Sequence, residues 1–150
     1  MEFSREINQT KAFKSESIKA MLNVAYTASI QQDRMVELLK PYQINDQHYN
    51  ILRILIGKNG EPASPGQVKA VLINSRGDLT RLVDKLVKMG LIDRGHSQHD
   101  RRSVELLITK KGKHLVERIA NEFDANLVYD FKITEKEAKQ LNNLLDKLRG

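Results

Sequence analysis

The chain has 150 residues, of which 40% are hydrophobic and 29% charged, a balance typical of a globular unit and too apolar for a disordered chain. It contains no cysteine, which excludes disulfides, thiolate catalysis, thiol redox sensing and thiolate metal sites. No apolar run approaches the roughly 18 residues that a membrane span needs, and the N-terminus lacks the apolar core of a signal peptide. We therefore expect a cytoplasmic protein with no membrane contact.

The net charge of +6 is concentrated in one segment. Residues 75–113 carry ten Lys or Arg side chains against five Asp or Glu, and so hold +5 of the total. A local excess of this kind attracts a polyanion, and nucleic acid is the commonest one in a cytoplasm. On charge alone a solvated basic surface explains the segment equally well, so the pattern of predicted elements has to decide.

The first half of the chain predicts three helices. Apolar residues recur at helical spacing over 15–39, which predicts a long first helix. Asn45 is a typical N-cap for a second helix, whose apolar residues cover most of its circumference and suit the middle of a core. The run Ser64-Pro65-Gly66-Gln67 combines an N-cap, a proline at the first helical position and the glutamine of a capping box, which predicts a short third helix.

The next segment predicts a fourth helix with one apolar and one polar face. It extends from about Ser75 to Gly90, and its inward residues are Leu79, Leu82, Val83 and Leu86. The opposite face then carries Gly77, Arg81, Asp84 and Lys88. Asp78 lies three residues after Ser75, so we expect its carboxylate to pair back to the capping residue. Together with the third helix, this segment outlines a helix-turn-helix.

The second half predicts a hairpin followed by two helices. Strand-like residues 91–94 and 104–108 enclose the wholly polar segment 95–103, which predicts a wing. Thr109 can cap the next helix, and Thr134 with Glu137 forms a capping box for the last one. That last helix has a narrow apolar stripe made of Ala138, Leu141, Leu145 and Leu148. A second copy of the chain is the simplest cover for the stripe, and burial within the monomer is the alternative.

These elements predict a site that reads duplex DNA. A recognition helix presents polar side chains to the major groove, where Arg81 is the strongest candidate for a base contact. Arg102 lies near the wing tip, where a guanidinium can enter a minor groove, and Asp100 is expected to orient an arginine. The candidate DNA-binding residues are Asn74, Ser75, Arg76, Gly77, Thr80, Arg81, Lys85, Arg101 and Arg102. For each of them an ordinary surface charge or polar residue is the alternative.

Residues 79–115 resemble the recognition helix and wing of the MarR family. The run Asp100-Arg101-Arg102 matches the family's Asp-x-Arg wing signature, and 108–112 (ITKKG) matches its Leu-Thr-x-x-Gly junction with Ile in place of Leu. Residues 41–72 resemble the family's second helix and the start of its helix-turn-helix. The sequence NSRGDLT at 74–80 departs from the Ser/Thr-rich start that many members carry at the recognition helix.

The resemblance implies a bacterial transcription regulator, taken here as a repressor, that acts as a homodimer on a pseudo-palindromic DNA site. It assigns Arg102 to the minor groove and Arg81 with its neighbours to the major groove. It also implies a small aromatic or anionic effector, bound between the dimerisation helices and the DNA-binding lobe, whose identity stays open. Tyr26, Arg34, His48, Tyr49 and Arg53 could line such a pocket, but each has an ordinary packing or surface role, so none is assigned.

We therefore predict a mainly α fold with a small β-wing, as one unit over 1–150. A winged helix-turn-helix lobe covers 45–109, and a helical dimerisation region covers 15–40 and 110–149. We expect neither an enzyme nor a cofactor, because the sequence has no phosphate-cradling glycine loop, no HExxH motif and no evident nucleophile with a base. His96 and His99 beside Asp100 lack a fourth ligand, so no metal is expected.

Two other functions are compatible with a basic winged helix. The first is a protein-binding module that uses the wing and the basic helix on an acidic partner. The second is an architectural DNA binder, which would bind duplexes with a steep salt dependence and little preference among sequences.

Overall fold

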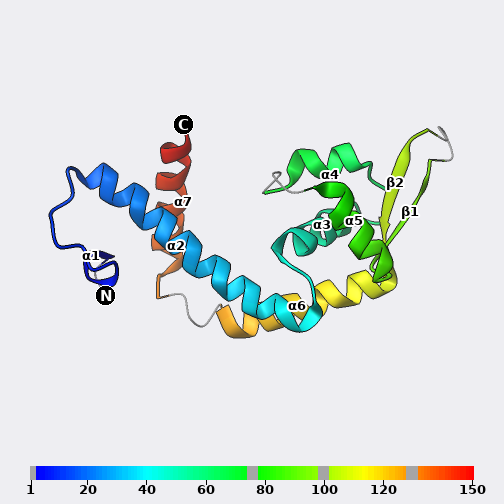
Figure 1. Cartoon of the computed structure of the whole chain (residues 1–150), viewed down its shortest axis with the longest axis horizontal. Helices are drawn as coiled ribbons and strands as arrows, with labels where there is room; N and C mark the ends of the chain where they lie inside the picture. The colour runs from blue at the N-terminus through cyan, green and yellow to red at the C-terminus, as the bar shows by residue number, and fades with distance from the viewer. Residues whose placement is uncertain (1–2, 74–77, 98–101, 128–131) are drawn as a thin grey trace.

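The computed structural model describes residues 3–73, 78–97, 102–127 and 132–150, with side chains in the third range described up to Phe123. Its elements are α1 (Phe3–Glu6), α2 (Glu16–Leu39), the 3-10 turn η1 (Lys40–Tyr42), α3 (Asp46–Ile56), α4 (Pro65–Val71), α5 (Leu79–Lys88), β1 (Ile92–His96), β2 (Val104–Ile108), α6 (Lys110–Leu127) and α7 (Glu135–Arg149). Helices α3 to α5 and the β-hairpin form one lobe, and α2 and α7 lie in the other part of the molecule (Figure 1). The predicted mainly α fold with a small β-wing is confirmed.

Side-chain caps fix where the helices begin. Ser15 caps α2 through its hydroxyl. The capping boxes predicted over Ser64–Gln67 and Thr134–Glu137 are both present. Asn45 caps α3 as predicted, and the third residue of this box is His48, whose Nδ1 accepts from the Asn45 backbone N–H at 3.2 Å. Local sequence therefore determines these helix starts.

The start of α5 differs from the prediction. The helix begins at Leu79 rather than near Ser75, and Asp78 is its N-cap. The Asp78 Oδ1 atom accepts from the backbone N–H groups of Thr80 at 3.0 Å and Arg81 at 3.4 Å. Asp78 therefore has a capping role, with its carboxylate taking the free N–H groups of the first turn, whereas its predicted partner Ser75 lies outside the described residues.

The wing is a two-stranded antiparallel hairpin. Its register runs from Ile92 opposite Ile108 to His96 opposite Val104, so β1 extends two residues beyond the predicted strand. Polar residues can occupy these outer positions because a hairpin arm does not need a buried face along its whole length. Ala63 adds a bridge to the other edge of β2, with backbone hydrogen bonds of 3.0 and 2.9 Å to Leu106.

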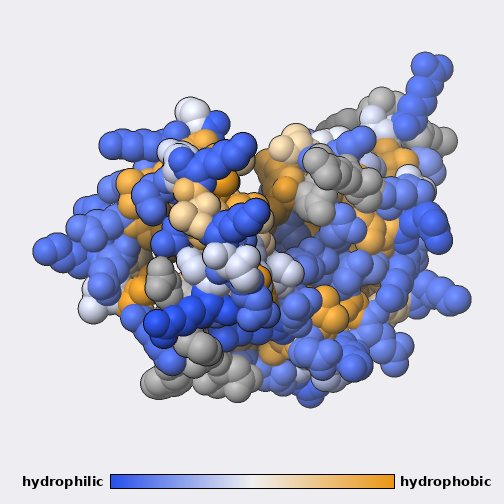
Figure 2. All heavy atoms as spheres, turned by 60° about the vertical axis from the view of Figure 1, so that its left-hand side comes forward, coloured by the Kyte–Doolittle hydropathy of each residue, from blue (hydrophilic) through white to orange (hydrophobic). Residues whose placement is uncertain are grey.

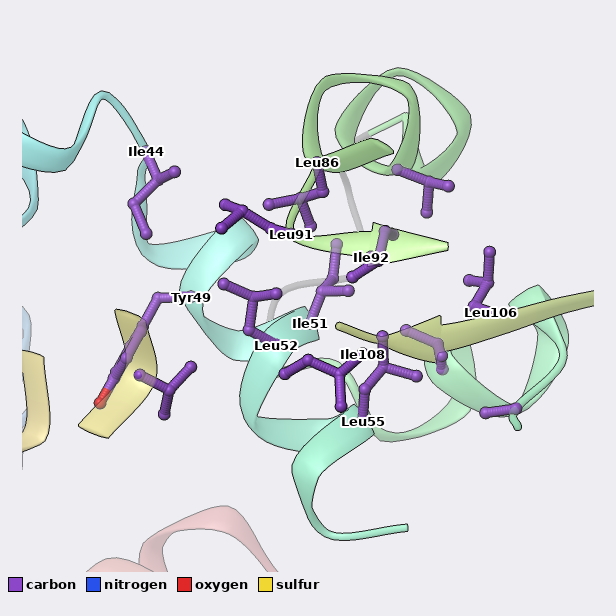
Figure 3. Close-up of a cluster of buried hydrophobic side chains, with 14 of the residues drawn as sticks. Ile44, Tyr49, Ile51, Leu52, Leu55, Leu86, Leu91, Ile92, Leu106 and Ile108 are labelled. Atoms are coloured by element: carbon purple, nitrogen blue, oxygen red, sulfur yellow. The ribbon is translucent and has the colours of Figure 1, made fainter. Parts of the chain in front are cut away.

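The hydrophobic core lies inside this lobe, around α3. Helix α3 buries apolar residues on several sides, as its sequence predicted. Figure 3 shows its side chains meeting those of α5, the wing root and the turn between them. The least exposed of these core residues are Ile51, Leu52, Leu55, Leu86, Leu91, Ile92 and Leu106. Helix α6 packs against both α3 and α2 and so joins the lobe to the rest of the molecule.

The junction between β2 and α6 approaches the end of α5 closely. The Thr109 hydroxyl donates to the Gly90 carbonyl at 2.8 Å and accepts from the Gly112 N–H at 3.0 Å. A Cβ atom added at Gly112 would lie 2.2 Å from the Leu91 carbonyl oxygen. The Thr-x-x-Gly pattern is therefore explained by one capping hydroxyl and one position where the backbones leave no room for a side chain.

The part of the molecule outside the lobe leaves much apolar surface exposed. In α7 the predicted stripe is not buried within the chain: Leu141 and Leu148 are exposed, and Ala138 and Leu145 are half-buried. The most exposed leucine of α7 is Leu144, at 63%, which the stripe had omitted. Figure 2 brings this side forward and shows apolar residues interspersed with polar ones on its surface. The exposed large apolar residues of α2 are Ile18, Met21, Leu22, Val24 and Val36.

The short helix α1 had no signal in the sequence analysis. Phe3 folds back onto α2, with its ring centroid 5.9 Å from that of Phe13 and 5.7 Å from that of Tyr26. Four residues are too few to show a periodic pattern, so this element depends on a tertiary contact. Within the described ranges, no helix combines the length and the apolar character that crossing a bilayer requires.

Candidate nucleic-acid interface

Helix α5 has one face in the core and one face in solvent. Val83 and Leu86 are buried, and Leu79 and Leu82 are half-buried, so the predicted inward face is confirmed. The predicted outward residues that the structure describes are Arg81, Asp84 and Lys88, and all three are exposed. The helix is therefore fixed from behind while its polar face is available to a ligand.

The first turn of α5 combines a cap with two exposed polar side chains. Because Asp78 accepts from backbone N–H groups, its carboxylate is engaged within the protein. Thr80 and Arg81 follow directly and are exposed, and Lys85 lies one turn further on. A helix N-terminus with an arginine and a lysine on its free face is electrostatically suited to a polyanion.

The wing carries an exposed arginine beside its tip. The backbone N–H of Ser97 donates to the Ser103 carbonyl at 2.9 Å, which closes the hairpin just below the tip. Arg102 follows the tip and is exposed. His96 is exposed at the end of β1, and the described residues hold no group of three or more His, Asp or Glu side chains that could bind a metal ion.

Four of the nine predicted DNA-binding residues fall within the described residues, and all four are exposed: Thr80, Arg81, Lys85 and Arg102. The other five, Asn74, Ser75, Arg76, Gly77 and Arg101, lie outside the described residues, as does the predicted orienting residue Asp100. Of the predicted set, the structure thus places two basic residues on α5 and one on the adjoining wing.

The contact between α5 and the wing was not predicted from the sequence. Arg94 of β1 donates from Nη1 to Asp84 Oδ1 at 2.6 Å. A hollow of about 390 Å³ lies beside this pair, between the N-terminal half of α5 and the strands. The two-residue period of a strand would have placed Arg94 on the same side as the buried Ile92. Its partner on α5 depends on packing that no local pattern encodes.

A buried histidine lies behind α5. His48 is 5% exposed, and its pKa is lowered from 6.5 to about 4, chiefly by burial and then by the nearby Lys85 ammonium, while Asp46 opposes the shift. Its Nδ1 is already the acceptor in the cap of α3, so protonation would require that hydrogen bond to break. The neutral imidazole is therefore part of the folded lobe.

We expect the protein to lose stability as the pH falls from about 6.5 to about 4. His48 takes up a proton more readily in the unfolded chain, so unfolding is favoured across this window. The free energy of unfolding should fall by about 2 kcal/mol between pH 7 and pH 5. Denaturant titrations at several pH values would measure this loss.

A matched variant keeps the hydrogen-bond acceptor of the α3 cap but removes the titrating imidazole of His48. His48→Gln should retain the cap, because glutamine is a natural third residue of a capping box, and should flatten the pH dependence. His114→Gln, at an exposed residue of α6, is the matched control for replacing a histidine with glutamine. A wild-type curve that stays flat to pH 5 would contradict the assignment.

Two hollows border helices α2 and α3. One, of about 770 Å³, lies between α3 and α6, and the other, of about 380 Å³, lies between α2 and the ends of α3 and α4. Both are lined by Met35, Tyr49 and Arg53. Of the other residues considered from the sequence, Tyr26 packs against Phe3 and His48 is buried at the α3 cap.

Comparison with known proteins identifies relatives that match part of this chain. Residues 42–103 match the model of the MarR family. The HTH-type transcriptional regulator PrsX of Escherichia coli is 32% identical over 88 residues, which cover 59% of this chain and 53% of that protein. The transcriptional repressor MprA of Escherichia coli K12 is 31% identical over 83 residues, which cover 55% of this chain and 47% of that protein. The chain therefore spans about half the length of the curated relatives it matches.

A solved structure matches almost the whole chain. The crystal structure of a MarR mutant from Escherichia coli complexed with operator DNA has a TM-score of 0.72 and 24% sequence identity, and the match covers 91% of this chain and 99% of that one. This likeness shows that the chain has the same fold. The names of these relatives denote transcription regulators rather than enzymes.

Proposed function

We propose that this chain is a transcriptional repressor of the MarR family that reads duplex DNA as a homodimer, starting from the match of residues 42–103 to the model of that family. The observation that carries the proposal is the exposed polar face of α5, with Arg81 in its first turn and Arg102 on the adjoining wing. A related fold has been crystallised with operator DNA, which supports the same mode of binding here.

In this proposal the helix and the wing meet different grooves. The major groove admits an α-helix, and an arginine on its exposed face can donate two hydrogen bonds to guanine. Arg81 has that role, and Lys85, one turn further from the helix N-terminus, contacts a phosphate. Arg102 enters the minor groove, where a narrow groove concentrates negative potential. Asn74, Ser75, Arg76, Gly77, Thr80 and Arg101 remain proposed contacts, with Asp100 as the proposed orienting residue.

The proposed homodimer rests on the apolar surface outside the lobe. Leucines on α7 and several apolar residues on α2 stay exposed within one chain, and surface of this kind is usually covered by a partner. A second copy related by a twofold axis would present two recognition helices to half-sites about one DNA turn apart. The expected binding site is therefore pseudo-palindromic.

The proposal extends to control by a small-molecule effector. The two hollows near α3 share a tyrosine ring, a methionine and a guanidinium, a lining that suits a small aromatic acid. A ligand held between α2 and α3 would change how the lobe sits on the dimerisation helices, and so the spacing of the recognition helices. Its identity stays open.

Selection of bound duplexes from a fragmented genomic library tests the proposal. The wild type should enrich one palindromic site at both low and physiological salt. The Arg81→Ala, Arg102→Ala variant should lose this enrichment, and Arg81→Ala alone should cost about 1 to 3 kcal/mol of binding, with relaxed preference at one position per half-site. Adding aromatic acids to the wild-type selection would test the effector.

The same experiment includes a charge control and distinguishes the proposed function from the two rival functions. Arg5→Ala with Lys11→Ala removes the same charge from the exposed N-terminal segment and should select the wild-type site. Salt-sensitive retention of all duplexes, without enrichment, would favour an architectural DNA binder. No retention of duplexes, together with binding of an acidic protein, would favour a protein-interaction module.

A further inference from the structure

An ion pair links the exposed face of α5 to the inner face of the wing. The Arg94 and Asp84 side chains meet at 2.6 Å and remain 40% and 51% exposed, respectively. Asp84 lies about one turn after Arg81, and Arg94 lies in the middle of β1 opposite Leu106. The pair therefore joins the two elements that the proposed function assigns to different grooves.

The ion pair lies where apolar packing between helix and wing ends. At the wing root, Ile92 and Ile108 are a register pair and both are buried. Further out, Arg94 and then His96 follow on the same face of the hairpin, where they border the 390 Å³ hollow. The remaining lining comes from Pro65, Leu79, Thr80, Val83, Gly95 and Val104. Packing therefore fixes the wing root, whereas the outer half of the wing has open space beneath it.

We infer that Asp84 and Arg94 are positioning residues, which brace the wing against α5 and so hold Arg102 where it can enter a minor groove while α5 lies in the major groove. This inference rests on the proposed function. A carboxylate on a DNA-facing surface is repelled by phosphates, so Asp84 lowers affinity unless it has a compensating role. Fixing the wing angle is that role.

We expect the ion pair to affect the affinity for DNA rather than the stability of the folded chain. Ion pairs that are this exposed contribute little to the stability of the folded chain. A wing that is free to pivot about its root would instead have to become ordered when it binds DNA. The conformational entropy lost by the wing would then offset part of the affinity that the Arg102 contact contributes.

The alternative is that Arg94 contacts a phosphate itself. The two assignments predict opposite signs for Asp84→Asn. If Arg94 contacts DNA, removing the carboxylate frees its guanidinium and removes a repulsive charge, so affinity should rise. If the pair is a brace, affinity should fall despite the favourable change in charge.

The test is a double-mutant cycle on the duplex selected by the wild type, at physiological salt. Asp84→Asn should lower the affinity about fivefold in the wild-type background and less than about twofold in the Arg102→Ala background, because a misplaced wing can lose only what Arg102 contributes. In the free protein, hydrogen exchange of the wing amides over 103–105 should become faster in Asp84→Asn.

A matched variant separates the brace from a change in net charge. Asp93→Asn removes the same charge from the neighbouring exposed residue of β1, whose side chain points to the opposite face, and should cause no loss of affinity. Unchanged or tighter binding by Asp84→Asn would overturn the brace, as would an equal loss in both backgrounds. A wild type that selects no duplex would instead overturn the proposed function and this inference with it.

Discussion

Replacing Gly112 with alanine should destabilise the lobe by at least about 2 kcal/mol, because the new methyl group has no room. Its Cβ would lie 2.2 Å from the Leu91 carbonyl oxygen and 2.8 Å from Ile108 Cγ1. The first neighbour is backbone at the turn that connects α5 to β1, so relief would require α6 to move away from the core. Denaturant titration, repeated at several protein concentrations to account for association, would measure the loss.

Gly66→Ala is the matched control for this effect. Gly66 is also in the first turn of a helix, but a Cβ there would meet nothing closer than the Ser64 hydroxyl at 3.8 Å. Alanine is the better helix former by about 1 kcal/mol, so this variant should be as stable as the wild type or more stable. Equal stability of Gly112→Ala and the wild type would show that α6 does not approach the turn this closely.

The parts of the fold that were predictable depend on local sequence. The capping boxes over Ser64–Gln67 and Thr134–Glu137 involve residues three apart, so the chain nearby contains all the information they need. The start of α5 was predicted wrongly because Ser75 and Asp78 are both good caps by composition. The carboxylate of Asp78 accepts from two N–H groups, and the apolar period of the helix begins only at Leu79.

The candidate site was predictable only in part, for a related reason. Helical periodicity placed Arg81 on a free face, and the structure confirms that exposure. The partner of Arg94 was not predictable, because Asp84 lies ten residues away on another element and meets it only through the packing of α5 on β1. The sequence likewise shows a glycine at 112 without showing that another backbone lies against it.

Charge introduced on the exposed leucines of α7 should separate the proposed dimer. Leu144 is 63% and Leu148 52% exposed, and they lie four residues apart on one face of the helix. A glutamate at both positions would bury two charges if that face packs against a second copy, which costs several kcal/mol. Leu144 is preferred over Leu145 because Leu145 is already half-buried within one chain.

The Leu144→Glu, Leu148→Glu variant should sediment as a monomer and bind the full palindrome about 100-fold more weakly than the wild type, because the two half-sites are then filled independently. Its affinity for a single half-site should match that of the wild type, since the lobe carrying Arg81 and Arg102 is unchanged. Asn142→Glu with Asn143→Glu adds the same charge to the other side of α7 and should remain dimeric. If the leucine variant still sediments as a dimer, the subunits associate through another surface. If the variant is monomeric and binds the palindrome with full affinity, reading DNA does not require the paired recognition helices.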